Sequence, residues 1–203
     1  MKKERYLTVK KKLPLFIILI GLLLLGTSLW QSTQTKIQTN HALEKAKKLI
    51  SKKQSLPAAV NKKIEQSAPP KTGDTVGLLK ISKIKAELAI VEGTNPDDLK
   101  KGVGHYKGSY LPGDKGQIVL SGHRDTVFRK LGELKIGDQL IMEMPNGNFT
   151  YEITKTKIVK ANDLSIITLQ HKQEELILTT CYPFHYVGNA PKRYIIYAKP
   201  IKN

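Results

Sequence analysis

The sequence predicts a mainly β domain, an antiparallel barrel or sandwich, preceded by an N-terminal membrane anchor. Three observations support this prediction. An uncharged apolar run covers residues 13–30, and short apolar runs separated by Gly, Pro and Asn begin at Asp74. The connections between these runs leave little room for the crossover helices that usually join parallel strands. The 203 residues therefore divide into one globular domain and an N-terminal extension.

Most of the positive charge lies outside the predicted domain. Lys and Arg total 34 against 17 Asp and Glu, which gives a net charge of +17. Residues 1–73 carry +12 of this charge and residues 74–203 carry +5. This distribution argues against nucleic acid as a partner, because nucleic-acid-binding domains concentrate basic residues on the folded surface. The single cysteine excludes an internal disulfide and a Cys-rich zinc site.

Residues 13–30 are expected to form a single transmembrane anchor. As a helix they rise about 27 Å, close to the roughly 30 Å of a bilayer core. A cleaved signal peptide is the alternative, since Gly26-Thr27-Ser28 resembles a small-residue cleavage site. Leu29 and Trp30 continue the apolar run past that site, which favours an uncleaved anchor. The basic tail of residues 1–12 predicts a cytoplasmic N-terminus and an extracytoplasmic domain at the cell membrane.

Residues 31–73 are interpreted as an extracytoplasmic stalk or linker, because they are rich in Lys, Gln and Ser and contain no aromatic residue. Four apolar residues at helical spacing predict a short amphipathic helix here: Ala42, Ala46, Leu49 and Ile50. Pro57 interrupts this pattern, and Pro69-Pro70 close the segment. The simplest interpretation is a solvated spacer, while contact of its lysines with anionic lipid or wall polymer stays open.

Residues 74–203 are expected to form the globular domain, with about eight short strands. The sequence indicates strands at 76–81, 88–91, 117–121, 139–144, 149–159, 175–181 and 193–198. Pro145-Asn146-Gly147-Asn148 predicts a hairpin turn between two of them. Short helices are expected at 96–101 and 128–131.

Residue types suited to catalysis stand where apolar strands end. Cys181 ends one strand, but a free cysteine is also a common small core residue, so its position alone leaves both roles open. His123 follows the strand at 117–121, and a reactive thiolate needs a base or cation beside it. Arg193 is either a surface charge or a guanidinium that steadies a thiolate or an oxyanion. The two strand ends together favour a Cys–His site.

The remaining histidines are assigned lesser roles. His41 and His171 lie in polar segments and are expected to be exposed, whereas His105 is expected to pack or to hydrogen-bond within a loop. His185 is four residues from Cys181, but a short separation within a loop does not by itself create a catalytic pair.

These motifs resemble the signatures of the sortases, the membrane-anchored cysteine transpeptidases of Gram-positive bacteria. The similarity lies in Ser121-Gly122-His123-Arg124-Asp125, Leu178-Thr179-Thr180-Cys181 and the downstream Arg193. The segments 181–184 and 187–194, and Gly104-His105-Tyr106 followed by Leu111-Pro112-Gly113, are similar to the class D branch. The resemblance extends over residues 74–200. Two departures are Ile177 where the common pattern has Thr, and His185 where class D members often have Tyr.

The resemblance implies a closed eight-stranded barrel with His123, Cys181 and Arg193 in one groove. Cys181 would attack the Thr carbonyl of an LPxT-type sorting signal and form a thioacyl enzyme. His123 would act as general acid and base, and Arg193 would stabilise the oxyanion. The amine of a peptidoglycan precursor would resolve the intermediate. No cofactor and no metal site is expected.

Three other functions remain open at this point. An L,D-transpeptidase also forms a thioacyl intermediate, but it normally has a His-Gly pair beside its Cys, which Cys181 lacks. A non-enzymatic wall-binding barrel explains the basic residues 1–73 and leaves Cys181 and His123 without a purpose. A pilin-polymerising sortase often has an upstream Asp-Pro-aromatic lid motif, whereas the prolines here are in Pro69-Pro70-Lys71. The preferred function is attachment of single proteins to the cell wall.

Overall fold

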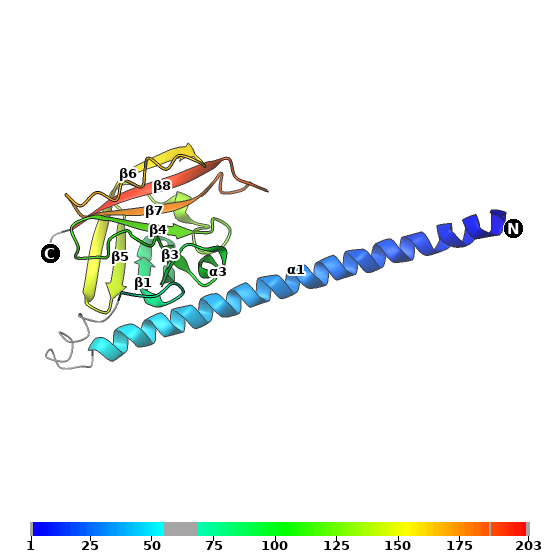
Figure 1. Cartoon of the computed structure of the whole chain (residues 1–203), viewed down its shortest axis with the longest axis horizontal. Helices are drawn as coiled ribbons and strands as arrows, with labels where there is room; N and C mark the ends of the chain where they lie inside the picture. The colour runs from blue at the N-terminus through cyan, green and yellow to red at the C-terminus, as the bar shows by residue number, and fades with distance from the viewer. Residues whose placement is uncertain (1, 55–68, 187, 202–203) are drawn as a thin grey trace. The chain divides into compact units, whose positions relative to one another are not determined.

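The computed structural model describes residues 2–54, 69–186 and 188–201, and the side chains of all of these except residues 2–12 and 53–54 (Figure 1). One long helix, α1, precedes a β-barrel with short helical turns between its strands. In chain order the elements are α1 (Lys2–Gln54), β1 (Thr75–Ile81), η1 (Ser82–Ile84), β2 (Ala86–Glu92), α3 (Pro96–Leu99), β3 (Val103–His105), β4 (Gln117–Gly122), η2 (Leu131–Glu133), β5 (Gln139–Met144), β6 (Gly147–Lys160), β7 (Glu175–Tyr182) and β8 (Lys192–Pro200).

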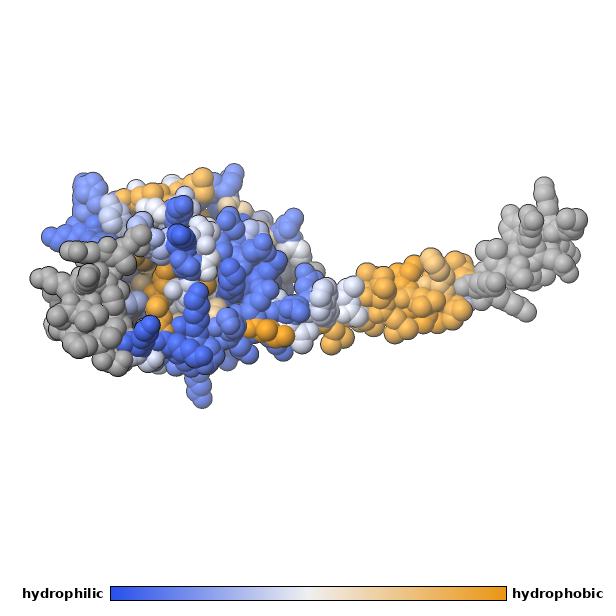
Figure 2. Space-filling model, turned by 60° about the horizontal axis from the view of Figure 1, so that its bottom comes forward, coloured by the Kyte–Doolittle hydropathy of each residue, from blue (hydrophilic) through white to orange (hydrophobic). Residues whose placement is uncertain are grey.

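The first part of α1 is a candidate membrane span. The helix from Leu13 onward is long and apolar enough to cross a bilayer, and none of the side chains in its most apolar stretch is buried within the protein. Its large apolar residues are exposed from Leu13 to Trp30, and Figure 2 shows them as a continuous hydrophobic surface on the helix. Exposed apolar side chains along several helical turns suit a lipid environment. The candidate span therefore lies where the sequence predicts an anchor.

The eight strands form a closed barrel in the order β1-β2-β3-β4-β7-β8-β6-β5. The β2–β3 and β4–β7 pairs are parallel and the other pairs are antiparallel. The expectation of a purely antiparallel sheet is therefore wrong for two pairs. Parallel neighbours need a crossover connection. Here one crossover contains the single-turn α3, and the other contains the β5–β6 hairpin in place of a long helix.

The predicted elements agree with the structure in most places. All seven expected strands are present, each beginning and ending within a few residues of the prediction, and the β5–β6 turn occurs at Pro145-Asn146. The three-residue β3 was not predicted, because Gly102 precedes it, Gly104 is its central residue and its apolar run is too short. The prediction of a helix at 128–131 is wrong. That segment forms turns that place Phe128 in the core, and the 3₁₀ helix η2 begins only at Leu131.

The alternation of β7 separates the barrel interior from the face that carries Cys181. Leu176 and Leu178 belong to the interior core, whereas Ile177 packs in a second cluster outside it with Ile195 of β8. Successive side chains of a strand point to opposite faces. Cys181 therefore shares the outer face of the barrel with Ile177.

The later part of α1 belongs to the same compact unit as the barrel, and this unit begins at Thr39. The residues of its buried face, Ala42, Ala46 and Ile50, pack against Leu78 of β1 and Ala89 of β2. Lys47 forms a 2.7 Å ion pair with Glu87, which raises the pKa of the lysine and lowers that of the glutamate. The predicted helical segment is thus present, but as the end of the 53-residue α1 instead of a separate short helix. The barrel covers its alanine and isoleucine face, and Leu49 is exposed. Pro57 lies outside the described residues.

We expect Ala46→Asp to release this part of α1 from the barrel, because Ala46 is fully buried and a carboxylate there has no partner. The free energy of unfolding should fall by about 1–3 kcal/mol, the value of burying a few apolar side chains. Urea unfolding of the full chain in detergent, followed by circular dichroism, measures this loss. Lys45→Asp changes an exposed neighbour on the same helix and should leave the midpoint nearly unchanged; an equal loss in both variants would contradict the packing argument.

Candidate active site

The three predicted site residues lie at the same end of three neighbouring strands, β4, β7 and β8. Cys181 is directly opposite Arg193 in the antiparallel β7–β8 pair. The parallel β4–β7 pair ends at Gly122 and Thr180, so His123 and Cys181 continue that register by one residue each. Directly opposed residues share a face, with Cβ atoms about 4.5–5.5 Å apart. Folding thus brings together residues that are 58 positions apart in the sequence.

Cys181 is presented to the outside by a tightly held strand end. Thr180 is buried, and its Oγ1 donates a 2.7 Å hydrogen bond to the Gly122 carbonyl oxygen. This bond joins β7 to β4 one residue before the cysteine and the histidine, so the role of Thr180 is structural. Cys181 is partly exposed and its thiol is free. A substrate can reach such a thiol, unlike the thiol of a buried structural cysteine.

His123 is exposed at the start of a tight turn. Its carbonyl oxygen accepts hydrogen bonds from the Thr126 amide at 3.3 Å and the Phe128 amide at 3.0 Å. Phe128 is fully buried, and a Cβ at Gly122 would lie 2.5 Å from its ring. Gly122 therefore allows the turn to close against the core immediately before His123. Its part in the site was not predicted, because the sequence does not show which ring would pack there.

Arg193 lies beside Cys181 through the strand register, and its guanidinium is held by the backbone. Nη1 donates to the Ala190 carbonyl oxygen at 3.2 Å and to that of Lys192 at 2.9 Å. No ion pair to Arg193 is found within the described ranges of the chain. A guanidinium without a carboxylate partner keeps its positive charge available for an anion that forms nearby.

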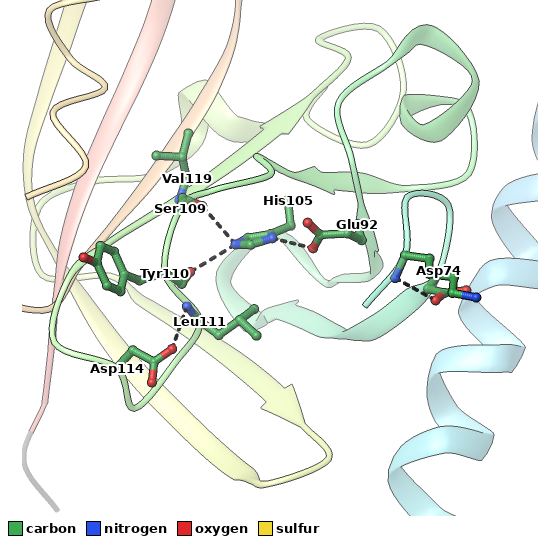
Figure 3. A network of polar contacts seen from close by, with 9 residues as sticks. Asp74, Glu92, His105, Ser109, Tyr110, Leu111, Asp114 and Val119 are labelled. Carbon is green, nitrogen blue, oxygen red and sulfur yellow. Dashed lines mark hydrogen bonds and ion pairs between the residues drawn. The ribbon is translucent and has the colours of Figure 1, made fainter. Parts of the chain in front are cut away.

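His105 has a different environment, in a buried polar network (Figure 3). Its Nδ1 is 2.6 Å from Oε2 of Glu92, and its Nε2 is 3.0 Å from the Tyr110 carbonyl oxygen and 2.9 Å from Oγ of Ser109. Ser109 Oγ also accepts a 3.2 Å hydrogen bond from the Val119 amide. The Ser–His–Glu order resembles a catalytic triad, but His105 is only 3% exposed and both ring nitrogens are engaged. The network fastens the loop after β3 to β4, so the predicted hydrogen-bonding role of His105 is confirmed. Its expected place in a loop is wrong, because His105 is the last residue of β3.

The other three histidines, His41, His171 and His185, are exposed. His41 lies on α1 and His171 in the β6–β7 connection, as expected from their polar surroundings. His185 follows Pro183 in the β7–β8 loop. Of the five histidines, His123 is thus the exposed one whose position continues the strand register of Cys181.

A groove of about 600 Å³ adjoins the end of β7 that bears Cys181. One wall is formed by residues 182–186, immediately after the cysteine, and the other by residues 129–133, downstream of His123. Aromatic rings support the first wall, since the Phe184 ring centroid is 5.7 Å from that of Tyr182 and 5.3 Å from that of Tyr194. The charged residues that line it are Arg129, Lys130 and Glu133.

The acidic residues of the described chain do not gather into a metal site, since no group of three or more His, Cys, Asp or Glu is placed to hold an ion there. Glu92 is bound to His105. Asp97 is paired with Lys100 at 2.8 Å, and this hydrogen bond lowers the pKa of its carboxyl.

Comparison with known proteins identifies the family of this barrel. The family model of the sortase domain matches residues 79–201, more than half of the chain. This chain belongs to the sortase family. The sortase is 57% identical to Sortase D of Bacillus subtilis (strain 168) over 197 residues, which are 95% of this chain and 100% of that relative.

Solved structures of class D sortases are similar as well. The sortase D5 transpeptidase of Clostridium perfringens is 26% identical, with a TM-score of 0.69 over 81% of this sortase and 99% of that chain. The catalytic domain of sortase D from Bacillus anthracis is 45% identical, with a TM-score of 0.57 over 68% of this sortase and 94% of that chain.

These relationships make the protein a cysteine transpeptidase of class D, an enzyme that acts on proteins with a sorting signal. The closed barrel implied by the resemblance is confirmed. Two alternative functions left open by the sequence, an L,D-transpeptidase and a non-enzymatic binding barrel, are therefore wrong for this chain. The sortase contains one cysteine, Cys181.

Proposed function

We propose that this sortase cleaves an LPxT-type sorting signal after its Thr and joins the new carboxyl terminus to an amine of a peptidoglycan precursor. The main observation in support of this proposal is the strand register, in which Cys181 has His123 on one side and Arg193 on the other. A nucleophile with a base on one flank and a cation on the other suits acyl transfer through a tetrahedral intermediate.

In the first half-reaction the Cys181 sulfur attacks the Thr carbonyl carbon of the signal. A C–S bond forms, and the negative charge that develops on the oxygen is stabilised by the Arg193 guanidinium. The C–N bond then breaks, and His123 gives a proton to the leaving amine. The products are a thioester on Cys181 and the released C-terminal part of the signal.

The outer face of the barrel offers a surface on which the peptide of the sorting signal can lie beside Cys181. Ser121 and Thr179 are opposite one another in the β4–β7 pair and are partly exposed on the face that carries Cys181. Ile166 and Ile167 of the β6–β7 connection pack beside this face through Ile177. An extended peptide laid along β4 and β7 would find apolar contacts on one flank and hydroxyl groups beneath it.

In the second half-reaction an amine attacks the thioester, the C–S bond breaks and an amide forms. His123 takes the proton from the incoming amine, which therefore approaches from the side by which the first amine departed. The groove between residues 129–133 and 182–186 lies on this side, because its wall of residues 129–133 follows His123 in the chain. Arg129 and Lys130 suit carboxylates of a peptide acceptor, and Glu133 suits its ammonium group.

The same proposal covers location. Residues 13–30 anchor the enzyme in the cytoplasmic membrane by a single pass, residues 1–12 remain in the cytoplasm and residues 31–73 connect the anchor to an extracytoplasmic catalytic domain, 74–203. Supporting observations are the apolar span of α1 and the basic tail that precedes it. β1, the first strand of the barrel, begins at Thr75.

Incubation of the full chain in detergent with a library of LPxTx peptides and candidate amines tests the proposed function. Mass spectrometry should find a thioacyl adduct on Cys181, cleavage after Thr and an amide joined to a cell-wall peptide amine. Cleavage only of unrelated peptides would contradict the signal assignment. Transfer only to a lysine of a second copy of the substrate protein would show the pilin-type alternative instead.

Replacing Arg193 with lysine tests whether its shape or only its charge is needed. Lysine keeps the charge but loses the planar fork, so a role in oxyanion stabilisation predicts a loss of about 10²-fold in the rate of acylation. Rapid-quench detection of the thioacyl enzyme measures this step. Lys192→Arg, a change at the exposed neighbouring position, should have little effect. Nearly full activity of Arg193→Lys would mean that positive charge alone suffices.

A further inference from the structure

The residue after His123 is a buried arginine with an unusual set of partners. Arg124 is only 6% exposed. Its Nη1 donates to the Pro183 carbonyl oxygen at 3.0 Å, and its Nη2 donates to those of Tyr186 at 2.6 Å and Gly188 at 2.9 Å. One guanidinium therefore binds three carbonyl oxygens of the β7–β8 loop, which starts after Tyr182, the residue that follows Cys181.

The charge of Arg124 is balanced chiefly by backbone dipoles. Its carboxylate neighbour, Asp125, is 3.5 Å from Nε and is itself largely exposed. The guanidinium carbon lies 5.8 Å from the ring centroid of Tyr186, within the range of a cation–π contact. The planar fork of an arginine presents five N–H donors from three nitrogens, whereas a lysine presents three donors from a single nitrogen.

These bonds connect the segment of His123 to the segment that leaves Cys181. Because Arg124 is held inward, the next residue back along the chain, His123, is directed outward at the strand end. The same loop continues to Ala190, whose carbonyl oxygen holds Arg193. A single buried side chain thus fixes the relative position of the two chain segments that flank the nucleophile.

We propose that Arg124 is a positioning residue of this sortase: it touches no substrate, and it holds His123 at the working distance from Cys181 by fastening the His123 turn to the β7–β8 loop. This inference rests on the proposed role of His123 as the acid and base. A misplacement of about 1 Å in such a group can lower a rate about 10²-fold.

Three variants separate the donors of Arg124 from its packing and its charge. Arg124→Met keeps an apolar stem of similar length, Arg124→Lys keeps the charge, and Arg124→Ala removes both. Met and Lys should each lower kcat about 10- to 100-fold, with KM for the peptide changed less than about threefold, since the peptide site itself is intact. Ile153→Val shortens a core residue on β6 and supplies a control for lost stability without a change at the site.

A double-mutant cycle with His123→Ala decides how Arg124 acts, and the rate of Cys181 alkylation by iodoacetamide over a range of pH provides a readout that needs no peptide. Arg124→Lys should reproduce the pH profile of His123→Ala, and the double variant should match the single His123→Ala variant within about twofold. A full, additive loss in the His123→Ala background would overturn the proposal. So would a profile like wild type, or a loss no larger than that of Ile153→Val at equal stability.

The two proposals fail in different ways. If no LPxT-type peptide is cleaved by the wild-type enzyme, the proposed signal is wrong, and the alkylation cycle still reports whether Arg124 positions His123. If peptides are cleaved but the cycle is additive, the function stands and the positioning role does not.

Discussion

Replacing Cys181 with alanine should abolish both cleavage of the sorting peptide and formation of the thioacyl enzyme. Loss of a covalent nucleophile removes the pathway itself, so a fall of at least about 10⁴-fold in kcat is expected. The chain has no second cysteine that can take its place. Intact-mass spectrometry during turnover should show the acyl adduct on the wild-type enzyme and none on the variant.

The fold should survive this change, which makes the result interpretable. Cys181 is partly exposed, and its neighbour Thr180 carries the bond that joins β7 to β4. Alanine at position 181 therefore leaves that bond and the core contacts of β7 in place, and the thermal midpoint should move by only a few degrees. Turnover near the wild-type level would show that the thiol is not the nucleophile.

The strands were predictable because their signal is local. An apolar run bounded by Gly, Pro or Asn indicates a strand whatever it pairs with, and the Pro145-Asn146 turn identifies one hairpin. Pairing direction depends on contacts distant in the sequence. Nothing within β4 or β7 shows that they lie parallel, because their connection contains the whole β5–β6 hairpin. This explains why the antiparallel expectation failed at the strands that carry the site.

The residues of the candidate site also divide into those that the sequence predicts and those that it does not. Cys181 and His123 were predictable from strand ends, and Arg193 chiefly from the family resemblance. The role of Arg124 was hidden, because its partners are backbone carbonyls, which have no residue signature, and because arginine is usually exposed. Likewise, the apolar spacing of Ala42 and Ala46 predicts a helix face but not the barrel surface that covers it.

Identification of the acid and base depends on geometry more than on sequence distance. His185 is four residues from Cys181 and lines the groove, yet it lies in the β7–β8 loop and outside the strand register. His105 is buried and engaged with Glu92 and Ser109. His123 is 58 residues from Cys181 and adjoins it in the strand register. The register therefore favours His123 over both alternatives.

His123→Ala should lower the rate of acylation and the rate of aminolysis by at least about 10²-fold each, because one group serves as acid in the first step and as base in the second. His185→Ala should leave acylation, which precedes acceptor binding, within about twofold of wild type, because His123 is the group proposed to give the proton to the leaving amine. Single-turnover kinetics with one LPxTx peptide, with and without an amine, separates the two steps for both variants. An active His123→Ala beside an inactive His185→Ala would assign the proton transfer to the loop histidine and show that strand register is a poor guide to the base. Loss of aminolysis alone in His123→Ala would mean that another group protonates the leaving amine.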